Sequence, residues 1–202
     1  MISNKISNGI NGNPIIPGDK SISHRSIIIP SISNGLCVVK NYLKSDDVIN
    51  TLKAFISMGV KIEENSNEII IHGKGLNSLK KPIKEIYLGN SGTSARLLTG
   101  LLASQKFDSI LTGDSSLSSR PMGRISKPLA QMNAEILTNN GSMPIKIIGK
   151  NLINSEIEIN IPSAQIKSGL ILAALNTTGK SKIIEHNITR DHTELMLEYF
   201  GA

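Results

Sequence analysis

The alternation of apolar and polar positions predicts a chain of short helices and strands. The segment Val48–Met58 places Leu52, Phe55 and Ile56 on one face of a helix, because these positions recur at helical spacing. The strand expected before it covers Cys37–Lys40. The same reasoning predicts helices at Leu97–Ala103, at Leu170–Leu175 and from Arg190 to Phe200, and strands at Ser109–Thr112 and Ser181–Glu185. A further helix is expected to begin within Arg120–Gly123 and to end at Met132-Asn133.

Two β-hairpins are expected, each after a predicted helix. In the first, Val60–Glu63 and Glu68–His72 flank a short polar turn. In the second, Glu135–Thr138 and Ile145–Ile148 flank Asn139–Gly141, whose Asn-Gly pair is a strong signal for a tight hairpin turn.

Three stretches of the chain share one order of parts. Each opens with a loop rich in Gly, Ser or Thr, at Gly18–Arg25, Gly89–Arg96 and Pro162–Gly169, and continues as helix, strand and helix. A hairpin follows in the first two but not in the third, so we expect a repeated unit whose third copy is truncated and a chain that is a piece of a longer protein. The expected units cover about 18–87, 88–160 and 161–202.

The composition points to anionic partners without identifying them. The 202 residues carry a formal net charge of +6, but only 3% are aromatic, none is Trp, and the basic residues are scattered. Small phosphorylated ligands therefore suit the charge at least as well as nucleic acid, which is the usual partner of basic chains. No apolar run approaches the ~20 residues that cross a bilayer. A single cysteine, Cys37, fits a reducing compartment, and we expect a cytoplasmic protein.

The first Gly/Ser/Thr-rich loop holds two cations beside its small polar residues. A helix N-terminus attracts phosphate or carboxylate, because its backbone N–H groups and its dipole both favour negative charge. Lys20, Ser21 and Arg25 could lie on one face there, with Arg25 as a bidentate donor. Ordinary helix capping by the small polar residues explains a single loop equally well.

The other two loops offer further candidates. Gly92 allows a ligand to approach the backbone closely, and Arg120 precedes a proline that favours an extended conformation at the arginine itself. Ser163 and Gln165 are neutral donors, whereas Arg190 could equally form a local ion pair and cap. The four His and one Cys show no ligand spacing, so no metal is expected. The sequence also has neither a P-loop nor a dinucleotide-binding fingerprint, and no cofactor is expected.

Five motifs in one order are similar to those of 5-enolpyruvylshikimate-3-phosphate synthases, and the chain resembles that family over nearly its whole length. It looks nearest the bacterial branch that carries Thr-Arg-Asp-His-Thr-Glu. The motifs are Pro17–Arg25, Leu88–Arg96, Gly113–Leu117 with Arg120–Arg124, Ala164–Ser168, and Thr189–Glu194.

The resemblance implies an α+β fold of inverse βαβαββ units, three in each of two domains, with a ligand cleft between the domains. Residues 1–17 would belong to the other, mostly absent domain, and residues 18–202 would form the repeat domain. The family transfers the carboxyvinyl group of phosphoenolpyruvate to shikimate 3-phosphate, works without a cofactor, and is expected to be monomeric. With glycine at position 92, the complete enzyme is expected to be sensitive to glyphosate.

The family's site residues carry over motif by motif. Those expected to bind shikimate 3-phosphate are Lys20, Ser21, Arg25, Ser163, Ala164, Gln165 and Arg190. Those expected to bind phosphoenolpyruvate are Lys20, Gly92, Arg120 and Gln165. The proton acceptor and the catalytic lysine of the family would lie in the half that this chain does not contain, so the chain alone is expected to be inactive.

Three other interpretations stay open at this stage. The sister carboxyvinyltransferase, which acts on a UDP-amino sugar, normally has Lys-Asn where this chain has Lys20-Ser21, and it uses a reactive cysteine. Cys37 instead lies in an apolar run and is expected to be buried. A non-enzymatic module that binds nucleic-acid phosphates, and a folded but purely structural fragment, are the other two.

Overall fold

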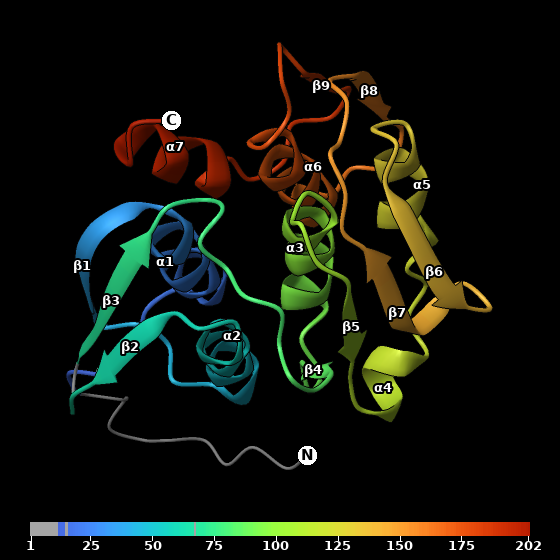
Figure 1. Cartoon of the computed structure of the whole chain (residues 1–202). Coiled ribbons are helices and arrows are strands. Elements are labelled where there is room, and N and C mark those ends of the chain that lie inside the picture. The colour runs from blue at the N-terminus through green and yellow to red at the C-terminus, as the bar shows by residue number, and fades with distance from the viewer. Residues whose placement is uncertain (1–11, 15, 67) are drawn as a thin grey trace, which may run out of the picture.

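The computed structural model describes residues 12–14, 16–66 and 68–202, and they form an α+β protein (Figure 1). Most of the segment 1–17, expected to belong to another domain, lies outside these described residues. The helices are α1 (Lys20–Ile32), α2 (Asp46–Ser57), α3 (Gly92–Ala103), α4 (Ser115–Ser118), α5 (Gly123–Ala130), α6 (Ala164–Ala174) and α7 (His192–Tyr199). The strands are β1 (Asn34–Lys40), β2 (Lys61–Glu64), β3 (Glu68–Lys74), β4 (Ile86–Tyr87), β5 (Ser109–Thr112), β6 (Glu135–Asn139), β7 (Ser142–Ile148), β8 (Glu156–Ile159) and β9 (Lys182–Glu185).

The strands form separate small sheets. The first has the order β1-β3-β2 with antiparallel pairs. The second has the order β4-β5-β7-β6, in which β4 and β5 are parallel and the remaining pairs are antiparallel. In the third, β8 and β9 form a parallel pair. In Figure 1 the first two sheets lie on opposite sides of the molecule, with α3 and α6 between them.

Helices α3 and α6 pack backbone against backbone at a pair of glycines. A Cβ on Gly100 would lie 1.8 Å from the carbonyl oxygen of Gly169, and a Cβ on Gly169 would lie 2.7 Å from the carbonyl oxygen of Arg96. Neither position can carry a side chain at this separation, because real Cβ contacts do not fall below about 3.0 Å. The two glycines therefore determine how close the helices lie.

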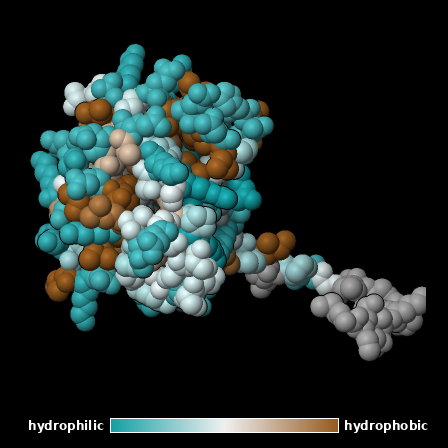
Figure 2. Space-filling model, turned by 90° about the vertical axis from the view of Figure 1, so that its right-hand side faces the viewer, coloured by the Kyte–Doolittle hydropathy of each residue, from teal (hydrophilic) through white to brown (hydrophobic). Residues whose placement is uncertain are grey.

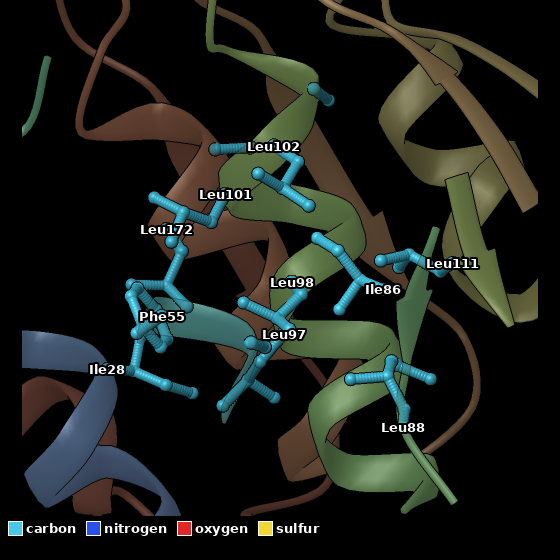
Figure 3. Packing of buried hydrophobic residues seen from close by; sticks show 14 of the residues in the cluster. Ile28, Phe55, Ile86, Leu88, Leu97, Leu98, Leu101, Leu102, Leu111 and Leu172 are labelled. Atoms are coloured by element: carbon cyan, nitrogen blue, oxygen red, sulfur yellow. The ribbon is translucent and has the colours of Figure 1, made fainter. Parts of the chain in front are cut away.

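The hydrophobic core is built around the leucines of α3. Figure 3 shows Leu97 and Leu98 facing Phe55 and Ile28 on one side of the helix, and these side chains are fully buried. Burying one such side chain contributes about 1.5–3 kcal/mol. The core also joins α3 to the second sheet and to α6 through Leu101, Leu102, Ile86, Leu88, Leu111 and Leu172.

Several predictions from the sequence are confirmed. Strand β5 has the predicted bounds, and both hairpins form. In the second hairpin Asn140 and Gly141 have φ of 49° and 80°, and positive φ at both central residues is what the favoured two-residue hairpin turn requires. The helix expected to stop near Met58 does so, and Gly59 follows it with φ of 85°.

The starts of three helices were predicted wrongly. Helices α1, α3 and α6 begin inside the segments that were expected to be loops. The Ser, Thr and Gly of these segments have modest helix propensity, but a capping side chain, Asp19, Ser91 or Ser163, precedes each helix and accepts a hydrogen bond from its first turn. The elements α4, β4 and β8 were not predicted; two of them have four residues and one has two.

Two burial predictions also need correction. Ile56 was placed on one helix face with Leu52 and Phe55, but it is 45% exposed, whereas those two side chains are buried on the side of α2 that packs against α1. Cys37 was expected to be buried; it is half-buried and packs against the core from β1, whose outward positions face solvent.

The surface mixes polar and apolar side chains. On the face that Figure 2 shows, hydrophobic residues form patches between hydrophilic ones. Among the described helices, none is long and apolar enough to span a membrane.

Candidate anion-binding site

The N-termini of α1, α3 and α6 open onto one cavity of about 490 Å³. Three helix dipoles therefore present their positive ends, and unpaired backbone N–H groups, to the same space. The capping hydrogen bonds that fix the three ends run from Ile22 N to Asp19 Oδ1 (2.8 Å), from Ser94 N to Ser91 Oγ (3.1 Å) and from Ile166 N to Ser163 Oγ (3.4 Å).

Most of the residues chosen from the sequence line this cavity. Ser163 is not part of the lining; it caps α6 directly behind it. The lining includes Lys20, Ser21, Arg25, Gly92, Arg120, Ala164, Gln165 and Arg190. Four further lining residues were given no role from the sequence: Asp19, Asp47, Asn90 and Thr93. Three of these four lie inside or beside the motifs, but their residue types alone do not distinguish a ligand contact from a cap.

Lys20 does not project into the cavity as an isolated charge. Its Nζ forms an ion pair with Asp47, in the first turn of α2, and about half of the lysine side chain is exposed. An anion that enters the cavity therefore competes with Asp47 for Lys20, and the pair lowers the local positive charge until it is separated.

Arg25 is 2% exposed and joins three helices through hydroxyl groups. Its Nε donates to Thr193 Oγ1 (2.6 Å), and its Nη2 donates to Ser168 Oγ (2.6 Å). Its Nη1 donates to both the carbonyl oxygen (2.9 Å) and the Oγ (2.7 Å) of Ser21. All these partners are neutral oxygens, and burial lowers the pKa of Arg25 although Glu194 partly opposes this effect. The guanidinium is therefore rigidly oriented at the floor of the cavity.

Gly92 lies between two arginines. A Cβ at this position would be 2.8 Å from Arg96 Nη1 and 3.0 Å from Arg120 Nη1. Arg96 is also buried, and its Nη1 donates to the carbonyl oxygen of Gly92 (3.0 Å). Burial, followed by the positive charges of Arg120 and Arg124, lowers the pKa of Arg96. The missing side chain at Gly92 thus leaves room for two guanidinium groups beside the cavity.

Arg120 is oriented by a relay of polar side chains. Its Nη2 donates to Asn90 Oδ1, and Asn90 Nδ2 donates to Asp114 Oδ2 (3.0 Å). Asp114 in turn accepts from the backbone N–H of Leu117 (2.7 Å), which holds the pKa of this carboxyl group below its usual range. The orientation of Arg120 therefore depends on residues of two separate motifs.

Gln165 connects α6 to α3 at the cavity wall. Its Nε2 donates to Thr93 Oγ1 (3.0 Å), while its Oε1 accepts from Arg96 Nη1 (3.0 Å). The direction of both bonds fixes which end of the amide faces each neighbour.

The segment that carries Arg190 is held by a buried lysine. Lys167 is 6% exposed and forms ion pairs with Glu185 (2.6 Å) and Glu194 (2.7 Å). Burial opposes the charge of Lys167, but its hydrogen bonds to both glutamates outweigh this and raise its pKa. Glu185 also accepts from Thr189 Oγ1 (2.7 Å), so both ends of the segment around Arg190 are tied to α6.

Three helix N-termini, the buried Arg25 and three further cations meet at one cavity, and the buried Arg96 lies next to it, bonded to Gly92 and Gln165 of its lining. This arrangement suits small molecules that carry phosphate or carboxylate groups. The family that this site belongs to follows from comparison with known proteins. A family model for EPSP synthase (3-phosphoshikimate 1-carboxyvinyltransferase) matches residues 5–202, and the chain belongs to this family.

Relatives and solved structures agree with this assignment. The chain is 52% identical over 198 residues to the 3-phosphoshikimate 1-carboxyvinyltransferase of Ruthia magnifica subsp. Calyptogena magnifica, which covers 98% of this chain and 46% of that protein. It is 46% identical to the protein of the same name from Listeria welshimeri, over 100% of this chain and 47% of the relative. A structure of EPSP synthase from Acinetobacter baumannii superposes with a TM-score of 0.90 at 48% identity, over 94% of this chain and 44% of that one. The chain thus spans about half the length of the proteins it matches.

Proposed function

We propose that this chain supplies one half of the active site of an enzyme that transfers the carboxyvinyl group of phosphoenolpyruvate to the 5-hydroxyl of shikimate 3-phosphate and releases phosphate. The single observation that carries the proposal is the cavity where the N-termini of α1, α3 and α6 meet the family's basic residues. Both substrates are polyanions, and such a cavity recognises them through backbone N–H groups and bidentate arginines.

The proposed roles divide the cavity between two ligands. Shikimate 3-phosphate would be bound by Lys20, Ser21, Arg25, Ser163, Ala164, Gln165 and Arg190, and phosphoenolpyruvate by Lys20, Gly92, Arg120 and Gln165. The position of Gln165, bonded to both Thr93 and Arg96 of α3 at the cavity wall, supports its contact with both ligands. Ser163 is the exception, since it would act from its place at the cap of α6.

The proposed reaction is addition followed by elimination. The substrate hydroxyl gives up its proton to a base as its oxygen bonds to the central carbon of phosphoenolpyruvate, while an acid protonates the methylene carbon. The tetrahedral adduct then loses a proton from the new methyl group to a base, and the C–O bond to phosphate breaks, so that phosphate leaves and the carbon–carbon double bond re-forms. Lys20 and Arg120 would stabilise the negative charge at the phosphate and carboxylate as it shifts, since preformed donors act without reorganisation. The proton transfers need positioned acids and bases, which we assign to the half of the enzyme outside this chain.

The domain division belongs to the same proposal. We place residues 1–17 in a second domain and residues 18–202 in one domain of three inverse βαβαββ units, at about 18–87, 88–160 and 161–202. Two observations support this. The sheet β4-β5-β7-β6 has a parallel pair followed by a hairpin, and β8-β9 is a parallel pair of the same kind, while β1-β3-β2 has the same hairpin arrangement as β5-β7-β6. We further propose a monomeric, cytoplasmic enzyme that uses no cofactor.

Calorimetric titration of the chain with shikimate 3-phosphate tests the half-site, with shikimate as the control that lacks phosphate. We expect saturable binding of the phosphorylated ligand, weakened about tenfold or more by Arg190→Ala, because a hydrogen bond to a charged group contributes about 1.5–3 kcal/mol. Arg190 is exposed, so the variant should fold. Arg124→Ala is the matched control, since Arg124 is an exposed arginine outside the cavity lining.

Either of two results would count against the half-site. One is a folded chain that binds neither ligand. The other is an equal loss of affinity in both arginine variants, which would indicate general attraction to positive charge rather than a specific contact.

A further inference from the structure

Ser21 can serve a bound anion only if its hydroxyl hydrogen points at that anion. A serine hydroxyl has one hydrogen to donate and two lone pairs that accept. An anionic oxygen only accepts, so the hydrogen of Ser21 must not be used elsewhere. The neighbours of Ser21 Oγ therefore decide whether this residue can contribute to binding.

One lone pair of Ser21 Oγ is already committed. Arg25 Nη1 lies 2.7 Å away, and a guanidinium can only donate. The rest of the Arg25 network also has fixed directions: Thr193 Oγ1 donates to Ser168 Oγ (2.7 Å), and Ser168 Oγ donates to the carbonyl oxygen of Ala164 (2.6 Å). None of these hydroxyl groups can therefore reverse its hydrogen bond to Arg25, and Ser21 Oγ always accepts a hydrogen bond from Arg25.

Within the described part of the chain, the other hydrogen-bonding neighbour of Ser21 Oγ is His192, in the first turn of α7. Its Nδ1 lies 3.2 Å from Ser21 Oγ, and this is the one link of the network whose direction is not fixed by chemistry. If Nδ1 carries a hydrogen, it donates to the second lone pair, and the Ser21 hydrogen turns to the cavity. If Nδ1 is bare, it accepts that hydrogen, and Ser21 presents only oxygen lone pairs to an anion.

We propose that His192 is a positioning residue: by donating from Nδ1 it keeps the Ser21 hydroxyl directed, together with Arg25, at an anionic oxygen of the ligand. The inference deepens the proposed function and rests on it for the identity of the ligand. The oxygen belongs to a carboxylate or a phosphate group, and the ligand arms of the experiment distinguish the two. Four of the five N–H groups of Arg25 have partners in the described part of the chain, which leaves one for the same oxygen or its neighbour.

The test measures how much Ser21→Ala weakens the binding of shikimate 3-phosphate, in the native chain and in chains with a changed residue 192. Asparagine can donate an N–H from the place of Nδ1, whereas aspartate can only accept. In the native chain and in His192→Asn, we expect Ser21→Ala to weaken binding of shikimate 3-phosphate about tenfold, the effect of one hydrogen bond to a charged group. In His192→Asp the same change should weaken binding less than about twofold, because the Ser21 hydroxyl already donates its hydrogen to the aspartate carboxylate and not to the ligand.

The control for added negative charge is His186→Asp. His186 is exposed and pairs with Glu158 away from the cavity lining, so Ser21→Ala should still cost about tenfold in that background. An equal cost of Ser21→Ala in all four backgrounds would overturn the proposal, since residue 192 would then have no influence through Ser21.

A second measurement does not depend on variants that must fold. Nitrogen-15 NMR of the imidazoles, in mildly alkaline buffer where histidine is ordinarily neutral, shows which ring nitrogen of His192 carries the hydrogen. With saturating shikimate 3-phosphate, or inorganic phosphate in parallel, we expect Nδ1 to be protonated; a bare Nδ1 in the complex overturns the proposal.

The ligand arms separate this inference from the function on which it rests. Binding of inorganic phosphate but not shikimate 3-phosphate would refute the proposed substrate and leave the role of His192 standing if Nδ1 donates. A Ser21→Ala effect that is also present with shikimate would assign the contact to the carboxylate, and an effect confined to phosphate-bearing ligands would assign it to the phosphate. A chain that binds none of them contradicts both proposals.

Discussion

His24 is a histidine that folding removes completely from water. It is 0% exposed, and its Nδ1 is bonded to Thr51 Oγ1 (2.8 Å) between α1 and α2, with Ser94 Oγ at 3.3 Å. Its Nε2 is buried without a partner in the described part of the chain. Burial lowers its pKa from 6.5 to about 4, with Asp47 partly opposing the shift. This side chain is therefore neutral in the folded protein under most conditions.

That neutrality predicts a loss of stability in mild acid. The unfolded chain takes up a proton at His24 near pH 6.5 and the folded chain only near pH 4. The contribution of His24 to the free energy of unfolding is therefore complete above pH 6.5 and is lost as the pH falls towards 4. The change in pKa from 6.5 to about 4 corresponds to about 3 kcal/mol of the free energy of unfolding. Urea unfolding near pH 6.5 and near pH 4 should show this loss in the free energy of unfolding.

His24→Asn supplies the comparison, because asparagine can bond to Thr51 but does not titrate. Other groups lose or gain protons in the same range, so the quantity of interest is the difference between the two chains. Identical pH dependence of native and variant unfolding free energies would refute the role of His24.

At the scale of elements, the site depends on how closely α3 and α6 approach. The N-termini of both helices reach the cavity, and the crossing at Gly100 and Gly169 determines their relative position. We expect Gly100→Ala to destabilise the fold by at least about 1–3 kcal/mol, since an added methyl group meets a backbone oxygen that can move only with its helix. Urea unfolding midpoints and slopes measure this.

The matched control is Gly123→Ala in α5. A Cβ there has only the end of the Lys127 side chain nearby, at 3.9 Å, so the change should be neutral or stabilising by about 0.4–1 kcal/mol. If Gly100→Ala proves as stable as Gly123→Ala, the close helix contact is not a constraint.

The elements that the sequence revealed are those whose signal is local. Alternation and an Asn-Gly turn were enough for β6 and β7, and the spacing of Leu52 and Phe55 was enough for α2. The first turns of α1, α3 and α6 were missed, because serine, threonine and glycine disfavour helices in isolation and only the caps and tertiary packing overcome this. Strand β4 has two residues, too few for any period to show.

The site was predictable in part for the same reason. The motifs contained Lys20, Arg120 and Gln165, but no local pattern shows that the three helices meet at one cavity. The pairing of Lys20 with Asp47 joins residues 27 positions apart, and the bond from Arg25 to Thr193 joins residues 168 positions apart. Contacts of that range follow from the fold and not from composition or spacing.

At the scale of the whole molecule, the chain spans 46% of a 52%-identical relative, and we propose that the other part completes the cavity. The chain alone should therefore release no phosphate from phosphoenolpyruvate and shikimate 3-phosphate. Mixing it with a separately produced polypeptide, containing the part of the Ruthia magnifica protein that this chain does not match, should restore release. Colorimetric phosphate detection measures both.

The control for this mixture is the chain with Arg120→Ala, which should support little release, because Arg120 would stabilise the negative charge at the departing phosphate and at the carboxylate. Phosphate release by the 202-residue chain without any partner would show that the division of the active site is wrong.

The two buried arginines, Arg25 and Arg96, affect how this protein could be engineered for higher thermal stability. Arg25 and Arg96 are desolvated, and their partners are neutral oxygens, so each is a charge that the empty fold must tolerate. A laboratory selection for heat resistance, carried out on the protein without ligand, would favour replacement of these arginines by apolar side chains. The melting temperature would then rise while the affinity for the anionic ligand fell, so the melting curve would not reveal the loss of binding. Such a selection should be run with the ligand present, because the arginines that bind the ligand then also stabilise the folded protein and are retained.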